Sequence, residues 1–211
     1  MGLSEFNAAQ LRQPEGAFGR FVIAGLLNRS NAELIDDTLE ALRLHAEDDF
    51  LDVGFGGGRA LALASRIVHR GNLYGVDVSA DMVKRGARKF RRLIDAQRLQ
   101  LMEADVVDLP LPDQSIDKIC TTNTIYFWPD PARALVSLRR VMRPGAIVAI
   151  GFTGESKMRS FDRITRHGFT SYSARAVFEL LDEAGFADVC VSPQEGRVSA
   201  GDYVARARRP H

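Results

Sequence analysis

The chain has 211 residues, of which 45% are hydrophobic and 26% are charged, as in an ordinary soluble globular protein. Its formal net charge is only +1, which argues against a dominant electrostatic field for nucleic acid or lipid headgroups. The longest apolar run, glycine included, is Phe21–Leu27, far shorter than the roughly 20 residues of a membrane span, and no secretory signal is visible.

The two cysteines, Cys120 and Cys190, lie in apolar runs and lack metal-ligand spacing. A chain of this length buries roughly 70% of its unfolded surface, so it needs no disulfide or metal to hold it together. We therefore expect buried free thiols, no metal site and a reducing, cytoplasmic location.

Residues 1–45 are predicted to form an N-terminal helical cap. Proline and glycine mark Arg12–Arg20 as a loop or turn, which leads into the apolar stretch Phe21–Leu27. Asn31 is a plausible N-cap of a helix. One face of that helix collects Leu34, Ile35, Thr38, Leu39 and Leu42. The pattern leaves open whether residues 10–30 close over a ligand site as a lid or only pack on the edge of a sheet.

From residue 49 onward, strand-like and helix-like segments alternate. The expected strands are residues 49–53, 72–76, 98–103, 115–121 and 146–152. The expected helices are residues 58–70, 79–94 (capped by Ser79), 130–142 and 173–184. The first two are expected to face inward with Ala60, Leu61, Ala64, Ile67 and Val68, and with Met82, Val83, Gly86, Ala87, Phe90 and Leu93. This alternation favours a parallel sheet that helices cover on both faces.

The end of the chain breaks the alternation. Two strand-like runs, Phe186–Ser192 and Asp202–Arg208, are joined by a segment too short for the crossover that parallel neighbours need. They must therefore be antiparallel to each other. The expected fold class is α/β, with a Rossmann-like sheet of seven mostly parallel strands, the last one antiparallel. We place this domain at residues 46–211, after the N-terminal helical cap.

A glycine loop joins the first strand to the first helix of this domain. It reads Asp52-x-Gly54-x-Gly56-x-Gly58 and opens a helix, an arrangement that brings backbone N–H groups and a positive helix terminus near a nucleotide-like ligand. The fingerprint of NAD-binding loops fails, because Arg59 stands where its third glycine belongs. The phosphate-binding P-loop also fails, because no Gly-Lys-Ser/Thr follows.

Asp77 stands at the end of the second strand. A carboxylate there accepts two hydrogen bonds from neighbouring ribose hydroxyls. Burial of that carboxylate against a polar ligand requires that its lone pairs are used. Asp77 alone serves NAD equally well, so it does not discriminate between cofactors.

At this point the sequence resembles a known family. It is similar to the class I S-adenosylmethionine-dependent methyltransferases of the small-molecule type, related to the ubiquinone/menaquinone-pathway enzymes. The resemblance covers residues 49–192 and rests on an ordered set of motifs, each weak alone. These are Leu51–Gly58, Gly75–Met82, Glu103–Pro110, Asp117–Ile119, Leu138–Gly145 and Leu181–Phe186.

The resemblance implies a cofactor site for S-adenosylmethionine. Its residues are Asp52, Gly54, Gly56, Gly58, Asp77, Val78, Met82, Asp105, Val106 and Asn123. Asp52 would place the amino group, and Asp77 the ribose hydroxyls. Asp105 would accept from the adenine amino group, and Asn123 would lie near the sulfonium methyl. The simpler alternatives are that Asp77 and Asp105 are helix caps or loop carboxylates, and that Asn123 is a turn residue.

A sulfonium methyl is already activated, so the protein must align an acceptor and exclude water. No catalytic triad or carboxylate pair is required. We expect a small, apolar or aromatic acceptor, bound by three segments near the carboxyl ends of the strands. These are Arg12–Arg20, the aromatic loop Asn123–Pro129 and the long connection Thr153–Tyr172.

Five side chains in these segments are candidates for substrate binding: Phe18, Tyr126, Phe127, Trp128 and His167. Tyr126 and His167 are also the candidate catalytic residues, since a general base is optional and His167 lies in a predicted lid. The alternatives are core packing for the aromatic side chains and a structural or surface role for the histidine.

A basic run, Lys84–Arg92, falls mostly opposite the apolar face of its helix. It is typical of a solvated helix back, and docking on acidic lipid or RNA is the sharper alternative. Two other functions stay open: a phospholipid-headgroup methyltransferase at the membrane surface, and a non-catalytic S-adenosylmethionine-binding protein. We expect a small-molecule partner, no nucleic acid, no stable membrane insertion, and a monomer or homodimer. The acceptor atom (oxygen, nitrogen, carbon or sulfur) stays open, because the fold serves all four.

Overall fold

The computed structural model describes residues 30–158, 170–194 and 200–211. The loop Arg12–Arg20, the apolar stretch Phe21–Leu27 and the candidate residues Phe18 and His167 lie outside the described residues. Their predicted roles therefore stay predictions.

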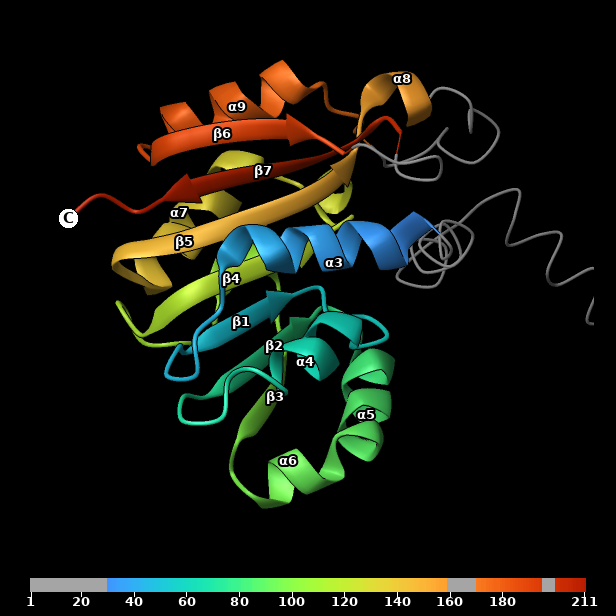
Figure 1. Ribbon diagram of the computed structural model, residues 1–211, viewed down its shortest axis with the longest axis vertical. Coiled ribbons are helices and arrows are strands. Elements are labelled where there is room, and N and C mark those ends of the chain that lie inside the picture. The colour runs from blue at the N-terminus through green and yellow to red at the C-terminus, as the bar shows by residue number, and fades with distance from the viewer. Residues whose placement is uncertain (1–29, 159–169, 195–199) are drawn as a thin grey trace, which may run out of the picture.

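The described residues include seven strands that form one sheet. They are β1 (Phe50–Val53), β2 (Leu73–Asp77), β3 (Leu99–Glu103), β4 (Ile116–Thr122), β5 (Met142–Thr153), β6 (Ala187–Pro193) and β7 (Asp202–Arg208). Their order is β3-β2-β1-β4-β5-β7-β6. The first five strands are parallel, and β7 is antiparallel to both β5 and β6 (Figure 1). The predicted seven-stranded, mostly parallel sheet is confirmed.

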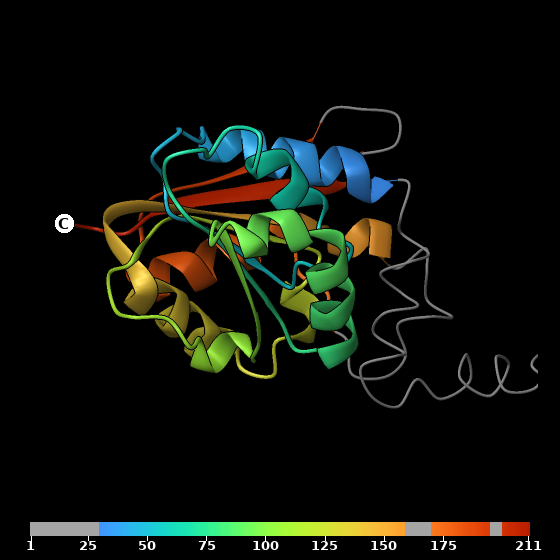
Figure 2. The ribbon, with the colours of Figure 1, turned by 90° about the horizontal axis from the view of Figure 1, so that it is seen from below.

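Helices cover both faces of this sheet (Figures 1 and 2). One face carries α3 (Ser30–Leu42), α4 (Arg59–Ala64), α5 (Ala80–Lys89) and α6 (Arg91–Asp95). The other face carries α7 (Pro131–Val141) and α9 (Ala174–Glu183), and two 3₁₀ turns, η1 (Val106–Asp108) and η2 (Ile125–Phe127), pack with them. A short helix, α8 (Glu155–Met158), follows β5. None of the described helices is long and apolar enough to cross a membrane.

Helix α3 lies close against the sheet. Leu34, Thr38 and Leu42 are buried, and the Thr38 hydroxyl donates to the Leu34 carbonyl at 2.6 Å. Gly151 in β5 permits this approach, because a Cβ there would collide with the Thr38 hydroxyl. The helix begins at Ser30, so the prediction that Asn31 is its N-cap is wrong.

The predicted helix over residues 58–70 is too long. Helix α4 ends at Ala64, where the backbone turns and the Ala64 carbonyl accepts from the N–H groups of both Ile67 and Val68. This turn buries Val68 and leaves Ile67 45% exposed, so Ile67 does not face inward as predicted.

The predicted helix over residues 79–94 is divided in two at Phe90, where the backbone leaves helical geometry. The buried Phe90 ring packs beside Gly58, and Met82 and Gly86 are buried as predicted, whereas Ala87 is exposed. The basic side chains of Lys84–Arg92 are exposed, as expected for a solvated helix back.

The two cysteines differ. Cys120 is fully buried in β4, at the centre of the sheet. Cys190 lies on β6, the edge strand, and is exposed, so the prediction that both thiols are buried is wrong for Cys190. An apolar run predicts a strand, and the position of that strand in the sheet decides how much of it is covered.

Candidate functional site

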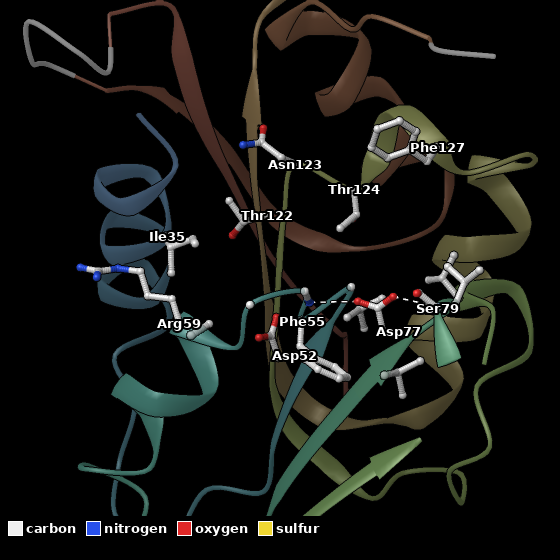
Figure 3. A pocket seen from close by; sticks show the side chains of 18 of the residues that line it. Ile35, Asp52, Phe55, Arg59, Asp77, Ser79, Thr122, Asn123, Thr124 and Phe127 are labelled. Atoms are coloured by element: carbon white, nitrogen blue, oxygen red, sulfur yellow. Dashed lines mark hydrogen bonds between the residues drawn. The ribbon is translucent and has the colours of Figure 1, made fainter. Parts of the chain in front are cut away.

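A cavity of about 490 Å³ lies at the carboxyl ends of the central strands (Figure 3). Its wall comes from the ends of β1, β2 and β4, from the glycine loop after β1, from the segment after β3, and from α3 and η2. Cavities of this size hold small molecules, and the edge where the order of parallel strands reverses is their usual place.

The glycine loop forms the floor of the cavity. Gly54 and Gly56 have φ angles of 71° and 47°, a region in which side chains are disfavoured. The Gly54 N–H donates to the Val76 carbonyl at 2.7 Å, which ties the loop to β2. Gly58 does not line the cavity; it is the N-cap of α4, and a Cβ there would collide with the Phe90 ring.

Asp77 is held at the end of β2 by two backbone donors. Its Oδ2 accepts from Gly56 N and its Oδ1 from Ser79 N, both at 2.9 Å (Figure 3). Burial raises the pKa of the Asp77 carboxyl, and the two hydrogen bonds oppose that rise. Each carboxylate oxygen accepts more than one hydrogen bond, so both retain capacity for the hydroxyls of a ribose.

Asp52, in β1, is only 4% exposed and lines the cavity (Figure 3). Among the described residues, its carboxyl has no hydrogen-bond partner. Burial, and then the charge of Asp77, raise the pKa of the Asp52 carboxyl to about 8. A buried carboxyl in this state suits a cationic ligand group that supplies both a charge and donors.

The segment after β3 brings Asp105 and Val106 to the cavity wall. Val106 is buried, whereas Asp105 is exposed and its Oδ1 accepts from Val107 N at 3.1 Å. Asp105 therefore caps η1, which was the simpler alternative for this residue, and it stands in the cavity wall as well.

Asn123 directly follows β4 and lines the cavity. Its φ angle of 56° lies in the left-handed region, which asparagine tolerates better than most residues. Its N–H donates to the Gly151 carbonyl at 2.8 Å, so the turn is tied to β5.

The three aromatic side chains after Asn123 divide into two groups. Phe127 and Trp128 line the cavity. Tyr126 does not line it and is 2% exposed, with its hydroxyl bonded to Asn123 Oδ1 at 2.9 Å. This geometry gives no support to Tyr126 as a catalytic or substrate-contacting residue, and it gives support to Tyr126 as a neighbour that fixes Asn123.

Two further predicted cofactor residues also differ in position. Val78 lines the cavity and is 54% exposed. Met82 does not line it, because its side chain is buried in the core beneath α5. Among the described residues no cluster of three or more potential ligands could hold a metal ion.

Several residues of the cavity wall are not among the predicted site residues. Ile35 is predicted only for a helix face, Thr122 is not among the candidates, and Thr124 lies in the predicted acceptor loop Asn123–Pro129 without a role of its own. Arg59 also lines the cavity, and its guanidinium pairs with Asp36 of α3, with Nε–Oδ1 at 3.0 Å and Nη2–Oδ2 at 2.6 Å. The fingerprint of NAD-binding loops has a glycine at this position, and Arg59, which stands there in this chain, lines the cavity.

Comparison with known proteins identifies the fold. A family model described as "Methyltransferase domain" matches residues 51–150, the stretch from β1 into β5 that builds the cavity. Residues 51–150 therefore resemble a methyltransferase domain. The predicted fold class is confirmed, and the predicted enzyme class and cofactor agree with this likeness.

The curated proteins to which the chain is similar include methyltransferases. The chain is 26% identical over 169 residues to the uncharacterized methyltransferase YdaC of Bacillus subtilis. This match covers 80% of this chain and 88% of that protein. It is 35% identical over 104 residues to the 2-phytyl-1,4-naphtoquinone methyltransferase of Trichormus variabilis. This match covers 49% of this chain and 45% of that protein. The predicted resemblance to quinone-pathway methyltransferases is confirmed.

A solved S-adenosylmethionine-dependent methyltransferase of Aquifex aeolicus has the same fold. The TM-score is 0.70 at 25% identity, and the match covers 90% of this chain and 98% of that chain.

The chain spans about half the length of most of the curated relatives it matches, for example 48% of one and 45% of another.

Proposed function

We propose that this protein transfers a methyl group from S-adenosylmethionine to a small organic acceptor of apolar or aromatic character. The observation that carries the proposal is the pairing of Asp52 and Asp77 across one glycine loop. Asp52 is a buried carboxyl without a partner among the described residues. Asp77 is a carboxylate that two backbone N–H groups hold in place, so both of its oxygens can accept from a pair of hydroxyls. Together they match a ligand that is cationic at one end and carries a ribose.

The residues of the cavity suit this cofactor from end to end. Asp52 would receive the methionine amino group, and Asp77 the ribose hydroxyls. Asp105 would accept from the adenine amino group, with Val106 beside the ring. When bound, the cofactor supplies a methyl group that its sulfonium charge has already activated.

The chain's own contribution is to bind, to orient and to exclude water. Ile35, Phe127 and Trp128 give the cavity an apolar wall, which suits an apolar acceptor and keeps water away. Alignment of the acceptor supplies roughly 7–11 kcal/mol of barrier lowering, so no covalent intermediate is needed.

Two further candidate residues, Phe18 and His167, lie outside the described residues, and the domain boundary and the location of the protein also stay proposals. Residues 1–45 form a cap on the methyltransferase domain, residues 46–211, and Phe18 and His167 contribute to the acceptor site. Helix α3 supports the cap, since it brings Ile35 to the cavity. We place the protein in the cytoplasm as a monomer or homodimer that binds no nucleic acid; the free thiols Cys120 and Cys190 suit a reducing compartment.

Methyl transfer to a panel of small acceptors tests the proposal. The protein is incubated with methyl-labelled S-adenosylmethionine and phenols, enolisable ketones, amines and thiols, and product is measured by mass spectrometry. We expect turnover of at least one aromatic or apolar acceptor, and less than a tenth of it in Asp77→Ala. Cofactor binding without transfer to any acceptor would support the alternative of a non-catalytic binding protein.

A further inference from the structure

Asp52 and Asp77 place two carboxyl groups in one cavity from neighbouring strands (Figure 3). Asp77, at the end of β2, accepts hydrogen bonds from the N–H groups of Gly56 and Ser79, and these bonds favour its charged form. Asp52, in β1, has no such donor among the described residues and is only 4% exposed. The two carboxyl groups therefore differ in how well the protein supports a negative charge.

No cation in the described part of the chain compensates Asp52. Arg59 of α4 is the only basic residue among the described residues that line the cavity. Its guanidinium binds Asp36 of α3 through two hydrogen bonds, and in Figure 3 it points away from Asp52. In β4, Cys120 is the register partner of Asp52, and burial raises the pKa of its thiol, so it stays neutral.

The surroundings of Asp52 favour its protonated form. The other two acids of the cavity wall, Asp77 and Asp105, add no positive charge. A buried carboxylate beside a like charge is disfavoured, and the backbone donors leave the charge on Asp77. In agreement, burial and then the charge of Asp77 raise the pKa of the Asp52 carboxyl to about 8. At neutral pH the empty cavity therefore holds a proton on Asp52.

A ligand with an ammonium group reverses this preference. An ammonium brings one positive charge and three N–H donors, which the surroundings of Asp52 lack. Because an opposite charge and hydrogen bonds to the charged form both lower the pKa of a carboxyl, the carboxylate becomes the favoured form of Asp52. The O–H bond of the carboxyl breaks, its proton passes to the solvent, and no other bond changes.

We propose that the cavity exchanges one proton for one ammonium group: Asp52 is protonated while the cavity is empty and gives up its proton when the methionine end of the cofactor enters. The inference rests on the proposed cofactor and adds a pH dependence to its binding. The filled cavity binds fewer protons than the empty one, so the affinity rises with pH. The rise ends near pH 8, where Asp52 of the empty cavity is itself charged.

Two ligands that differ in their amino acid part test this exchange on the wild-type protein. S-adenosylhomocysteine carries the ammonium group, whereas 5′-methylthioadenosine has the same adenosine and thioether but no amino acid part. Calorimetry in phosphate and in imidazole, two buffers with different ionisation enthalpies, counts the protons that binding releases. At about pH 6.5 we expect about one proton per bound S-adenosylhomocysteine and none for 5′-methylthioadenosine.

The pH dependence and two variants locate the proton. The affinity for S-adenosylhomocysteine should rise about 10-fold from pH 6 to pH 7, as expected for one proton, and that for 5′-methylthioadenosine should stay constant. Asp52→Asn keeps the shape of the side chain and does not ionise, so S-adenosylhomocysteine should bind to it without proton release. Asp81→Asn, at an exposed carboxylate outside the cavity wall, should release as many protons as the wild type.

The failures of the two proposals are distinguishable. If the folded wild-type protein binds neither ligand, the proposed cofactor and the methyltransferase function are overturned. If S-adenosylhomocysteine binds without proton release, or if 5′-methylthioadenosine or Asp52→Asn releases as many protons, only the exchange at Asp52 is overturned. Should 5′-methylthioadenosine bind too weakly to measure, the comparison of wild type with Asp52→Asn decides.

Discussion

The Asp52 carboxyl lowers the stability of the protein without ligand, and it suits the binding of a cationic ligand group. Its carboxyl is buried without a partner among the described residues, and its pKa is raised from 3.8 to about 8. The unfolded chain gives up this proton near pH 4 and the folded chain only near pH 8. The folded state therefore binds more protons in this window, and the Asp52 carboxyl makes the empty protein less stable as the pH rises from about 4 to 8.

Asp52→Asn separates the two effects. The substitution should raise the free energy of unfolding of the empty protein by on the order of a few kcal/mol at pH 8, and by much less at pH 4. It should also weaken S-adenosylmethionine binding about 10-fold or more, since a charged hydrogen-bond partner is lost. Chemical unfolding at the two pH values and calorimetry measure these changes. A variant that is less stable at pH 8, or that binds the cofactor as tightly as the wild type, contradicts this role.

At the same scale, eight of the ten predicted cofactor residues line the cavity and two do not. Gly58 and Met82 occupy motif positions but pack against the core, whereas Ile35 and Arg59 line the cavity. Apolar periodicity indicates that a side chain is covered, and it does not distinguish cover by the core from cover by a ligand.

At the scale of elements, the contact of α3 with β5 depends on the absence of one side chain. Gly151→Ala places a Cβ against the Thr38 hydroxyl and should lower the free energy of unfolding by about 1–3 kcal/mol, the usual effect of overpacking. Thr38→Ala in the same chain should recover part of that loss, because the two sites are coupled. Gly57→Ala is the control, since nothing lies within 4 Å of a Cβ there. Additive effects at residues 38 and 151 would contradict the contact.

The elements themselves were predicted well where the pattern was long. Most strand positions and the starts of most helices agree within a residue or two. The exceptions are β5, which begins at Met142 and not at residue 146, α4, which ends earlier than the apolar pattern, and the next helix, which is divided at Phe90. In both helices a tertiary contact overrode helical propensity: Val68 turns beneath the sheet and the Phe90 ring packs beside Gly58.

The Arg59–Asp36 ion pair joins α4 to α3 at the rim of the cavity. Both side chains are nearly half exposed, at 46% and 47%, so solvent screening leaves the pair only about 0–1 kcal/mol of stability. We expect Arg59→Ala to change the melting temperature by at most about 2–4 °C, a small shift that thermal unfolding resolves. A large loss of stability would mean that α3 is held mainly by this pair rather than by its buried apolar face.

At the scale of the whole molecule, the order of the strands was partly accessible from the sequence. The short connection between the last two strands required an antiparallel pair, and the preceding alternation required parallel neighbours. The sequence did not show that β7 lies between β5 and β6, and this position brings Asp202 beside Thr153. Contacts between segments so distant in sequence have no local pattern that predicts them.

One cavity, built by the ends of these strands, is proposed to bind S-adenosylmethionine through Asp77. Calorimetry of wild type, Asp77→Ala and the control Asp81→Ala, an exposed carboxylate outside the cavity wall, tests it most directly. We predict that wild type and Asp81→Ala bind S-adenosylmethionine and S-adenosylhomocysteine alike. Asp77→Ala should bind both about 10- to 100-fold more weakly, from the loss of charged hydrogen bonds worth roughly 1.5–3 kcal/mol. No binding by the folded wild type, or equal binding by Asp77→Ala, would contradict the account.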